Sequence, residues 1–318
     1  MRKLLFVIFI FPFAVSAQLK WINVDADYQP LPEGVHVFFT NDLVDGKPNR
    51  AFYVSAELNQ KKLLFTTQVG NGKRFTPSEY FEKEVKPLLV VNTTFFEFVH
   101  NSNLNVVIKD REIVAYNIQS MPGKGKDTFT YRHPFGSAIG INKKRKADVA
   151  WLYTDSTNKF PLASQIAVSA YKDSFTMIKK DQLSQLGNFS KWKMQTAVGG
   201  GPVLVQNGVT KITNNEELKF GGKAILDKHP RTAMGYTQDG KLIVMAVEGR
   251  FPGKAEGANL EQLSRLLIDV GCQEALNLDG GGSSCLLVNG KQTITPSDKE
   301  GQRPVPAVFM IKSLGIRH

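Results

Sequence analysis

Cysteines and long hydrophobic runs are scarce in this chain, and each shortage excludes a class of protein. The 318 residues include two cysteines, too few for the disulfide framework of a small secreted scaffold. There is no Cys-x-x-Cys pair, and no two of the five histidines have the spacing of a zinc site. After the first residues, no apolar run is long enough for a transmembrane helix. We therefore expect no stable membrane insertion.

The first 17 residues have the pattern of a secretory signal peptide. Arg2 and Lys3 form a basic start, the apolar stretch 4–15 follows, and small residues lead to Ala17. We predict cleavage near Ala17 and a secreted or periplasmic protein. Export would permit a disulfide between Cys272 and Cys285, although both cysteines could equally be small buried residues, and the sequence leaves this open.

Basic residues outnumber acidic ones, with 40 Lys and Arg against 29 Asp and Glu and a net charge of +11. Such a balance favours nucleic acid, an anionic surface or a phosphorylated substrate. The basic residues are spread along the chain, and the one dense run, 143–146, follows a predicted strand. We interpret that run as a solvated hairpin tip. Together with export, this argues against nucleic acid as a partner.

Short apolar runs bounded by turn residues predict a strand-rich fold. The pattern indicates a helix beginning after Thr76, a longer one over 260–270, and a short one within 180–186. Strands and hairpins are expected elsewhere, at 35–40, 51–58, 88–96, 104–118, 136–153, 196–209 and 232–250. In the last hairpin, Asp239-Gly240 suits a type I′ turn. The predicted fold class is α+β, with mixed, mainly antiparallel sheets and a few packed helices.

Three regions follow from this pattern. We expect residues 1–17 to be the signal peptide, 18–87 a strand-rich N-terminal region, and 88–318 a third region, whose expected catalytic role rests on the family resemblance of its motifs. We expect 18–87 and 88–318 to form one compact unit, because no low-complexity linker separates them.

Polar and glycine residues gather where four apolar runs begin or end, which is where rigid sheets commonly present functional side chains. We expect the four groups to meet in space. They are Asn92-Thr93-Thr94, Gly199-Gly200-Gly201-Pro202, the span from His229 and Arg231 to Glu248 and Arg250, and Asn277 to Ser284.

The fourth group reads NLDGGGSS and suggests an anion site. Glycines 280, 281 and 282 could present successive N–H groups to a phosphate, with the hydroxyls of Ser283 and Ser284 as further donors. Asp279 would repel that phosphate unless arginine, a proton or a metal offset its charge. Arg231 and Arg250 are the available cations with fork geometry. Each feature alone also has a plain reading, as a turn or a surface residue.

Glu248 offers a second carboxylate, and a pair of carboxylates is what cleavage of a glycosidic bond commonly requires. An alternative makes Asp279 a ligand of a divalent metal, with Glu248 as a second ligand. In the first reading no cofactor is required. No Gly-x-Ser-x-Gly motif occurs, so neither Ser283 nor Ser284 has the setting of an esterase nucleophile.

In this combination the sequence resembles the phosphodiester glycosidase family. The resemblance covers most of residues 88–311 and keeps the family's order. Its segments are VVNTTFF (90–96), GGGPVLVQNG (199–208), RTAMGYTQDGKLIVMAVEGR (231–250), GANLEQLSRLLIDVGCQEALNLDGGGSSCLLVNG (257–290) and RPVPAVFMI (303–311). The chain departs from the family pattern at Thr93, Ala255 and Cys285, and the first two departures leave the sugar undetermined.

The resemblance implies a secreted hydrolase that cleaves between a sugar's anomeric carbon and a phosphodiester, so the partner is a sugar phosphodiester or phosphorylated glycan. It implies Asp279 and Glu248 as the catalytic carboxylates, without assigning their roles. Substrate-binding residues would be Asn92, Arg231, Arg250, Asn277, Gly280, Gly281, Gly282, Ser283 and Ser284. The alternative is a non-catalytic secreted protein of the same fold that binds a glycan or sugar phosphate.

Overall fold

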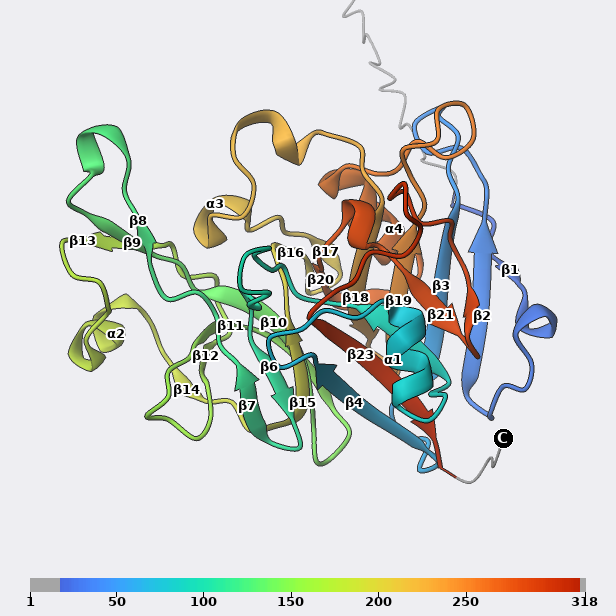
Figure 1. Cartoon of the computed structure of the whole chain (residues 1–318), viewed down its shortest axis with the longest axis horizontal. Helices are drawn as coiled ribbons and strands as arrows, with labels where there is room; N and C mark the ends of the chain where they lie inside the picture. The colour runs from blue at the N-terminus through green and yellow to red at the C-terminus, as the bar shows by residue number, and fades with distance from the viewer. Residues whose placement is uncertain (1–17, 315–318) are drawn as a thin grey trace, which may run out of the picture.

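The computed structural model describes residues 18–314 (Figure 1). The segment interpreted as a signal peptide, 1–17, lies outside the described residues. The largest sheet has eight strands in the order β1-β2-β3-β19-β18-β20-β16-β17. In that order the strands span Ile22–Asn23, Val35–Thr40, Ala51–Glu57, Lys241–Val247, Arg231–Thr237, Cys272–Asn277, Val203–Gln206 and Val209–Thr210.

Two further sheets complete the body of the molecule. One has five strands in the order β22-β21-β5-β23-β4, spanning Lys291–Gln292, Leu286–Val288, Leu89–Asn92, Ala307–Ser313 and Leu63–Val69. The other has seven, in the order β14-β12-β11-β10-β15-β6-β7, spanning Ser190–Lys191, Leu162–Ser164, Ala147–Tyr153, Gly136–Asn142, Met194–Gly199, Val107–Lys109 and Glu112–Ala115. Strands from 18–87 take part in two sheets, because β3 pairs with β19 and β4 with β23.

A small three-stranded sheet, in the order β13-β9-β8, extends from one end of the molecule as an arm (Figure 1). Its strands span Tyr171–Asp173, Tyr131–His133 and Met121–Pro122. This arm forms one side of a surface groove, and the helix α3 (Asn214–Glu217) forms the other side.

Helices are few and short. The α-helices of the described residues are α1 (Pro77–Lys83), α2 (Lys180–Leu186), α3 (Asn214–Glu217) and α4 (Leu260–Asp269). Single 3-10 turns are η1 (Asp25–Tyr28), η2 (Gly125–Asp127), η3 (Gly222–Ile225) and η4 (Gly281–Ser283). The expected antiparallel sheets are confirmed, but helices contribute so little that the fold is mainly β rather than α+β. None of these helices is long and apolar enough to cross a membrane.

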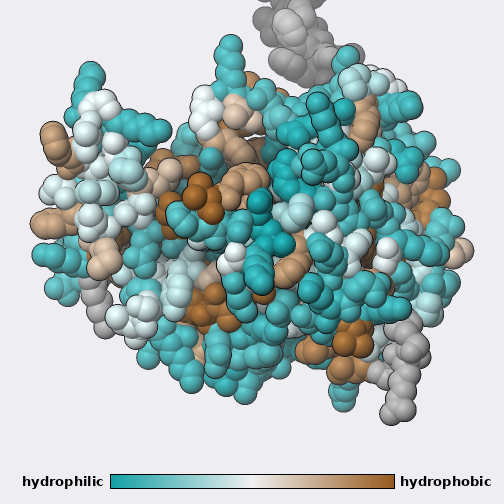
Figure 2. Space-filling model, in the orientation of Figure 1, coloured by the Kyte–Doolittle hydropathy of each residue, from teal (hydrophilic) through white to brown (hydrophobic). Residues whose placement is uncertain are grey.

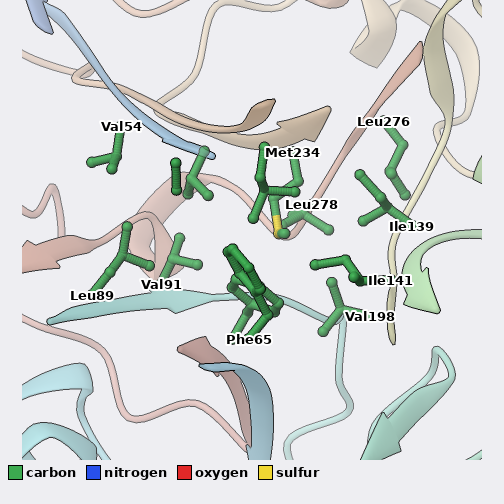
Figure 3. Close-up of a cluster of buried hydrophobic side chains, with 14 of the residues drawn as sticks. Val54, Phe65, Leu89, Val91, Ile139, Ile141, Val198, Met234, Leu276 and Leu278 are labelled. Atoms are coloured by element: carbon green, nitrogen blue, oxygen red, sulfur yellow. The ribbon is translucent and has the colours of Figure 1, made fainter. Parts of the chain in front are cut away.

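The main core lies where the inner faces of the three large sheets meet (Figure 3). Val54 and Met234 come from the eight-stranded sheet, Phe65 from the five-stranded sheet, and Ile139 and Val198 from the seven-stranded sheet. Because successive strand residues point to opposite faces, alternate residues face this shared core, as Val54 and Ala56 of β3 and Ile139 and Ile141 of β10 do. The three sheets therefore cannot shift independently.

Helices cover the outer faces of two sheets. Leu260, Leu263 and Leu267 of α4 pack on the eight-stranded sheet. Tyr80 of α1 packs on the outer face of β5 beside Val90. The residues of β5 alternate between the two faces of the sheet: Leu89 and Val91 face the main core, while Val90 faces α1.

The local signals for helix ends are confirmed. The Thr76 side chain accepts from the Glu79 N–H, and the Glu79 carboxylate accepts from the Thr76 N–H, which makes a capping box. Gly271 directly follows the last turn of α4 with φ +86°. Glycine suits that left-handed position, because a residue with a side chain is strained at such a φ.

The hairpin of β18 and β19 is confirmed, but its predicted turn type is wrong. A type I′ turn needs positive φ at both central residues, and here only Gly240 has it, at +85°. The Gly240 N–H donates to the Thr237 carbonyl at 3.1 Å. This is the pattern of a three-residue loop with a G1 bulge, in which one glycine supplies the left-handed residue.

The two cysteines are both buried and free. Cys272 begins β20 and Cys285 lies just before β21, so the two belong to different sheets. The reading as small buried residues is therefore the one that the structure bears out.

The basic run at 143–146 is not simply a solvated turn. Arg145 lies at the tip of the β10–β11 hairpin with φ +58°, and its guanidinium reaches the loop between β3 and β4. Nη1 donates to the carbonyls of Leu58 and Gln60 at 2.9 and 3.0 Å, and Nη2 donates to Leu63 at 2.7 Å. One side chain thus joins the seven-stranded sheet to the connection between the other two.

Replacing Arg145 with methionine should destabilise the protein, because three backbone carbonyls lose a charged donor. We expect a loss of roughly 2–3 kcal/mol in the free energy of unfolding, measured by urea denaturation. The matched control is Lys144→Met, at an exposed neighbour, which should change that free energy by less than about 0.5 kcal/mol. If the two substitutions changed the free energy of unfolding equally, the three hydrogen bonds of Arg145 would not stabilise the fold.

Candidate active site

The strand order brings the four polar groups of the sequence together at one end of the strands β18, β19 and β20. β18 pairs with β19 on one side and β20 on the other, and both pairings are antiparallel. The start of β18 therefore lies beside the ends of its two neighbours, with Arg231 opposite Val247 and Ala233 opposite Asn277. The segments that follow β19 and β20 leave the sheet together, next to Arg231.

Asn92 joins the five-stranded sheet to this end of the strands. It ends β5, has no exposed surface, and uses both ends of its amide. Nδ2 donates to the Asp279 carbonyl at 2.6 Å, while Oδ1 accepts from the Thr232 hydroxyl at 2.8 Å and from the Cys285 N–H at 3.0 Å. In this arrangement Asn92 positions the backbone on both sides of the glycine loop, and no atom of it is exposed to contact a substrate.

Asp279 is held by its backbone at the centre of the site. Its N–H donates to the Thr93 carbonyl at 2.8 Å, and its own carbonyl accepts from Asn92. Burial raises the pKa of the Asp279 carboxyl to about 7, while a hydrogen bond from Ser283, the charge of Arg303 and the Gly280 N–H act to lower it. A carboxyl with a pKa near neutrality can exchange a proton at physiological pH.

Arg303 is a functional candidate that sequence reasoning missed. Its Nε donates to the Asp298 carboxylate at 2.7 Å, and its Nη1 donates to the Ser283 hydroxyl at 3.4 Å. The charge of Arg303 lowers the pKa of the Asp279 carboxyl. Arg303 also hydrogen-bonds Ser283, whose side chain in turn hydrogen-bonds that carboxyl. The signal that could have found Arg303 was its position at the start of RPVPAVFMI, one of the segments that carried the resemblance.

Arg231 is a buried cation without a carboxylate partner. Its side chain is 3% exposed, Nε donates to the Ala258 carbonyl at 2.8 Å, and Nη2 donates to the Asp227 carbonyl at 2.9 Å. Within residues 18–314 no carboxylate oxygen lies within 4.0 Å of it. The pKa of Arg231 is lowered to about 10, chiefly by burial; the charge of Asp227 opposes this shift and the charge of Arg250 adds to it. A positive charge held in this way favours an anionic ligand.

Arg250 supplies a second, more exposed guanidinium. It has φ +67°, and among the described residues it forms no ion pair; its Nη1 only approaches the Ser297 hydroxyl, at 3.5 Å. Arg231 and Arg250 also act together on His229, whose pKa is lowered first by burial and then by these two charges. The neighbourhood is therefore cationic, and His229 is biased toward its neutral form.

The glycine loop is explained by the arginines that lie against it. Gly281 has φ +62°, and a side chain there would approach Arg250 Nη2 to 3.0 Å. A Cβ on Gly282 would lie 2.3 Å from Arg303 Nη2 and 3.0 Å from an Asp298 oxygen. The glycines thus let two guanidinium groups lie directly on the backbone.

The expected cradle of three N–H groups is largely absent. The Gly281 N–H donates to the Pro230 carbonyl at 2.8 Å, and the Gly280 N–H is directed at the Asp279 carboxyl. For Gly282 no internal acceptor is found within 18–314. The loop folds into a 3-10 turn, which uses its own backbone donors, so anion binding would depend mainly on arginine.

The remaining polar residues of the loop are buried. Asn277 donates to the Gly201 carbonyl at 3.0 Å, which joins the second polar group to the fourth. Its Oδ1 and the Ser284 and Thr93 hydroxyls are buried without a hydrogen-bond partner in the described chain. Such groups carry a free-energy cost unless a ligand or water satisfies them.

Glu248 lies in a separate network. Its carboxylate accepts from the Thr295 N–H at 2.7 Å and lies 3.6 Å from the Arg50 Nε. It is 6% exposed, and within the described residues neither a hydrogen bond nor an ion pair joins it to Asp279. Glu248 therefore holds the 293–303 segment, which also carries Arg303.

A metal at Asp279 would need unusual ligands. Within residues 18–314 there is no group of three or more His, Cys, Asp or Glu side chains with the geometry of a metal site. Ligands besides Asp279 would have to come from backbone, amide or hydroxyl oxygens or from the substrate. The charges around Asp279 are better suited to an anion.

Comparison with known proteins agrees with this chemistry. A family model described as phosphodiester glycosidase matches residues 86–312. Human N-acetylglucosamine-1-phosphodiester alpha-N-acetylglucosaminidase is 35% identical over 99 residues, 31% of this chain and 19% of that protein. An uncharacterized SPbeta prophage-derived protein of Bacillus subtilis, YomE, is 41% identical over 71 residues, 22% of this chain and 11% of that protein. The chain thus spans less than a fifth of these relatives' length.

Solved structures share the fold over much more of the chain. The catalytic domain of the zebrafish N-acetylglucosamine-1-phosphodiester alpha-N-acetylglucosaminidase, auto-inhibited by its pro-peptide, matches with a TM-score of 0.58 and 19% identity, covering 90% of this chain and 85% of that one. A hypothetical protein from Synechocystis matches with a TM-score of 0.60 and 16% identity, covering 94% and 64%. At these identities the likeness concerns the fold.

The raised pKa of Asp279 predicts that Asp279→Asn will stabilise the protein at high pH. In the unfolded chain this carboxyl loses its proton near its ordinary value of 3.8, but in the folded protein only near 7. Folding therefore becomes less favourable as pH rises from about 4 to 7, and the full cost remains above that range. The variant's melting temperature should exceed that of the wild type by more at pH 8 than at pH 5.

The control for this measurement is Glu300→Gln, which removes an exposed carboxylate and should change the melting temperature little at either pH. If Asp279→Asn had the same effect at pH 5 and pH 8, the carboxyl would not be a destabilising buried charge.

Proposed function

The chain belongs to the phosphodiester glycosidase family, and on that premise we propose that it hydrolyses the bond between a sugar's anomeric carbon and a phosphodiester. The observation that carries this proposal is the buried guanidinium of Arg231, which has no carboxylate partner within residues 18–314. It lies beside Arg250. The Arg231 side chain packs against Gly280, which directly follows Asp279, whose carboxyl pKa is raised to about 7.

The arginines would bind the phosphodiester and stabilise the departing phosphate. Arg231 is rigidly oriented by two backbone carbonyls, while Arg250 is exposed and free to close on a ligand. Stabilising charge that develops on a leaving group is worth most where the donors are already positioned. A phosphate is a good leaving group as its anion, so little assistance from a general acid is required.

Asp279 would then act as general base or nucleophile. As a base, it takes a proton from water, and the water oxygen attacks the anomeric carbon. The bond from that carbon to the phosphate oxygen breaks, and the phosphate monoester departs with the electron pair. Either role requires the ionised carboxyl, so activity should increase as pH rises through the pKa of Asp279.

The other site residues have supporting roles in this proposal. Asn92 and Thr93 fix the Asp279 backbone, Ser283 hydrogen-bonds its carboxyl, and Glu248 holds the segment that carries Arg303. We further propose that the protein acts after export, on the basis of the signal-like pattern of 1–17.

The first test is hydrolysis of a panel of sugar-1-phosphodiesters by the wild type and Asp279→Asn. We expect release of free sugar by the wild type and a loss of at least about 100-fold in kcat for the variant, because the base or nucleophile is removed. Glu112→Gln should retain wild-type turnover, since that carboxylate is exposed and lies on β7, the edge strand of the seven-stranded sheet.

The outcomes separate the alternatives. Full activity of Asp279→Asn would overturn the assignment of Asp279. Saturable binding of a sugar phosphate with no release by the wild type would indicate a binding protein of the same fold instead of a hydrolase.

A second prediction concerns Arg303, which acts through Asp279. Its charge lowers the pKa of Asp279, so Arg303→Met should raise that pKa and move the acidic limb of the pH–rate profile to higher pH. The profile of kcat/KM measures this directly. Arg74→Met is a matched control, because Arg74 contacts the same Phe98 ring as Arg303 but has no contribution to the pKa of Asp279. An unshifted limb in Arg303→Met would contradict this role.

A further inference from the structure

A second cavity lies beside the arginine site and is not explained by phosphodiester binding. Its volume is about 210 Å³, and its walls are mainly apolar. The residues that form these walls include Phe95, Leu104, Ile118, Pro134 and Phe220. Figure 2 shows hydrophobic side chains gathered next to α3 on a face that is otherwise largely hydrophilic.

The cavity adjoins the candidate active site through one aromatic ring. The Phe220 ring centroid lies 5.7 Å from the Arg231 guanidinium carbon and 5.9 Å from the Phe95 ring. The Phe220 ring therefore contacts the Arg231 guanidinium and also forms part of the cavity wall. Lys219 forms a second connection, because its stem packs against the backbone of Gly201, which accepts from Asn277.

The amide side chains of the cavity are already occupied. Asn105 accepts from the Phe95 N–H and donates to the Gly200 carbonyl. Asn117 accepts from the Val106 N–H and donates to the carbonyls of Gly136 and Leu152. Neither amide is free to recognise a heavily hydroxylated ligand.

Lys219 is the polar group that remains available. Its Nζ lies 5.3 Å from the Phe95 ring centroid, and within the described residues it has neither a hydrogen bond nor an ion pair. Burial lowers the pKa of the Lys219 ammonium, and the charge of Glu217 opposes this only in part. An anion placed in the cavity would stabilise the charged ammonium.

Glu217 does not satisfy Lys219, because its carboxylate has other donors. It accepts from the Trp151 indole at 3.2 Å, the Val203 N–H at 3.0 Å and the Thr213 hydroxyl at 2.6 Å, as well as from the N–H and hydroxyl of Ser137. These bonds fix Glu217 among the strands, so it is a structural anion rather than the missing partner.

We propose that this cavity binds a single six-membered ring that carries one carboxylate, with the ring against Phe95 and Phe220 and the carboxylate on Lys219. The size suits one ring, since a protein cavity of about 150 Å³ holds benzene. The apolar walls and the single free cation favour a ligand with one charge and few other polar groups. The idea that this ring is part of the substrate rests on the proposed function; the binding itself does not.

The cavity opens into a wider groove that could hold the rest of such a ligand. This groove has a volume of about 600 Å³ and shares Met121, Leu218 and Phe220 with the cavity. Lys124 and Arg132, from the β8–β9 arm, line this groove together with one acidic residue, Asp127, so that positive charge is in excess there. An acidic glycan or other anionic chain attached to the ring would meet favourable charge there.

Isothermal titration of the purified chain with benzoate and benzamide tests the proposal, because the two probes differ mainly in charge. We expect benzoate to bind at least about ten-fold more tightly. Lys219→Met should abolish this preference and Lys219→Arg should preserve it. The control Lys223→Met, at an exposed residue of the neighbouring η3, should leave it unchanged. Melting temperatures verify that the variants are folded.

Glucuronate and glucose form a second pair of probes and distinguish the origin of the ring. Preference for benzoate over benzamide supports the proposal, and a stronger preference there than for glucuronate over glucose indicates an apolar ring with few hydroxyls. Preference for glucuronate over glucose alone would overturn the proposal. Equal binding of acid and neutral probes, no binding of any, or the same preference in Lys219→Met would overturn it. Displacement of benzoate by equimolar inorganic phosphate would also overturn it, by placing Lys219 in the phosphodiester site.

These titrations are repeated in Asp279→Asn, which separates the two proposals. If no sugar-1-phosphodiester is hydrolysed but the carboxylate preference remains, the proposed function fails and the cavity assignment stands. If hydrolysis occurs without any preference for the carboxylate probes, the proposed function stands and the cavity assignment fails.

Discussion

The requirement that buried polar groups be hydrogen-bonded determines the geometry of this site. Asn92 has no exposed surface, and its one amide contacts the Asp279 carbonyl, the Thr232 hydroxyl and the Cys285 N–H. Thr232 belongs to β18 of the eight-stranded sheet, and Asp279 and Cys285 lie on either side of the glycine loop. Because each bond is desolvated, losing one leaves an unsatisfied group, so the loop has one stable position relative to β18.

On this framework the protein holds an excess of positive charge. Arg231 and Arg250 have no carboxylate partner in the described chain, and Arg303 is shared between Asp298 and Ser283. Glycines at 281 and 282 allow two of these guanidinium groups to lie on the loop backbone. Unpaired buried charge lowers the stability of the folded state, and such costs are typical of sites organised for a ligand rather than for stability.

The position of the site follows from the way three sheets share one core. Arg231, Asn277 and Asn92 lie at strand ends, and the strands are fixed by residues such as Met234 and Val91 that face that core. Catalytic groups at the ends of strands are held more precisely than groups within loops. The wider groove is different, since one of its sides is the small three-stranded arm (Figure 1), whose movement would change the groove and leave Asp279 in place.

The sequence by itself indicated most of the strands and the ends of helices α1 and α4, because these depend on local periodicity and capping chemistry. A distinctive run of glycines also marked Asp279, Arg231 and Arg250 as candidate site residues, whereas Arg303 was recognised only in the structure. The sequence also indicated the family through segments that keep their order. Tertiary structure alone decided the rest. Arg145 is part-buried and donates to three backbone carbonyls, the Gly281 N–H donates to the Pro230 carbonyl, Glu248 lies in a hydrogen-bond network apart from Asp279, and Lys219 faces an apolar cavity. Each of these depends on contacts between residues far apart in the chain, which no local pattern encodes.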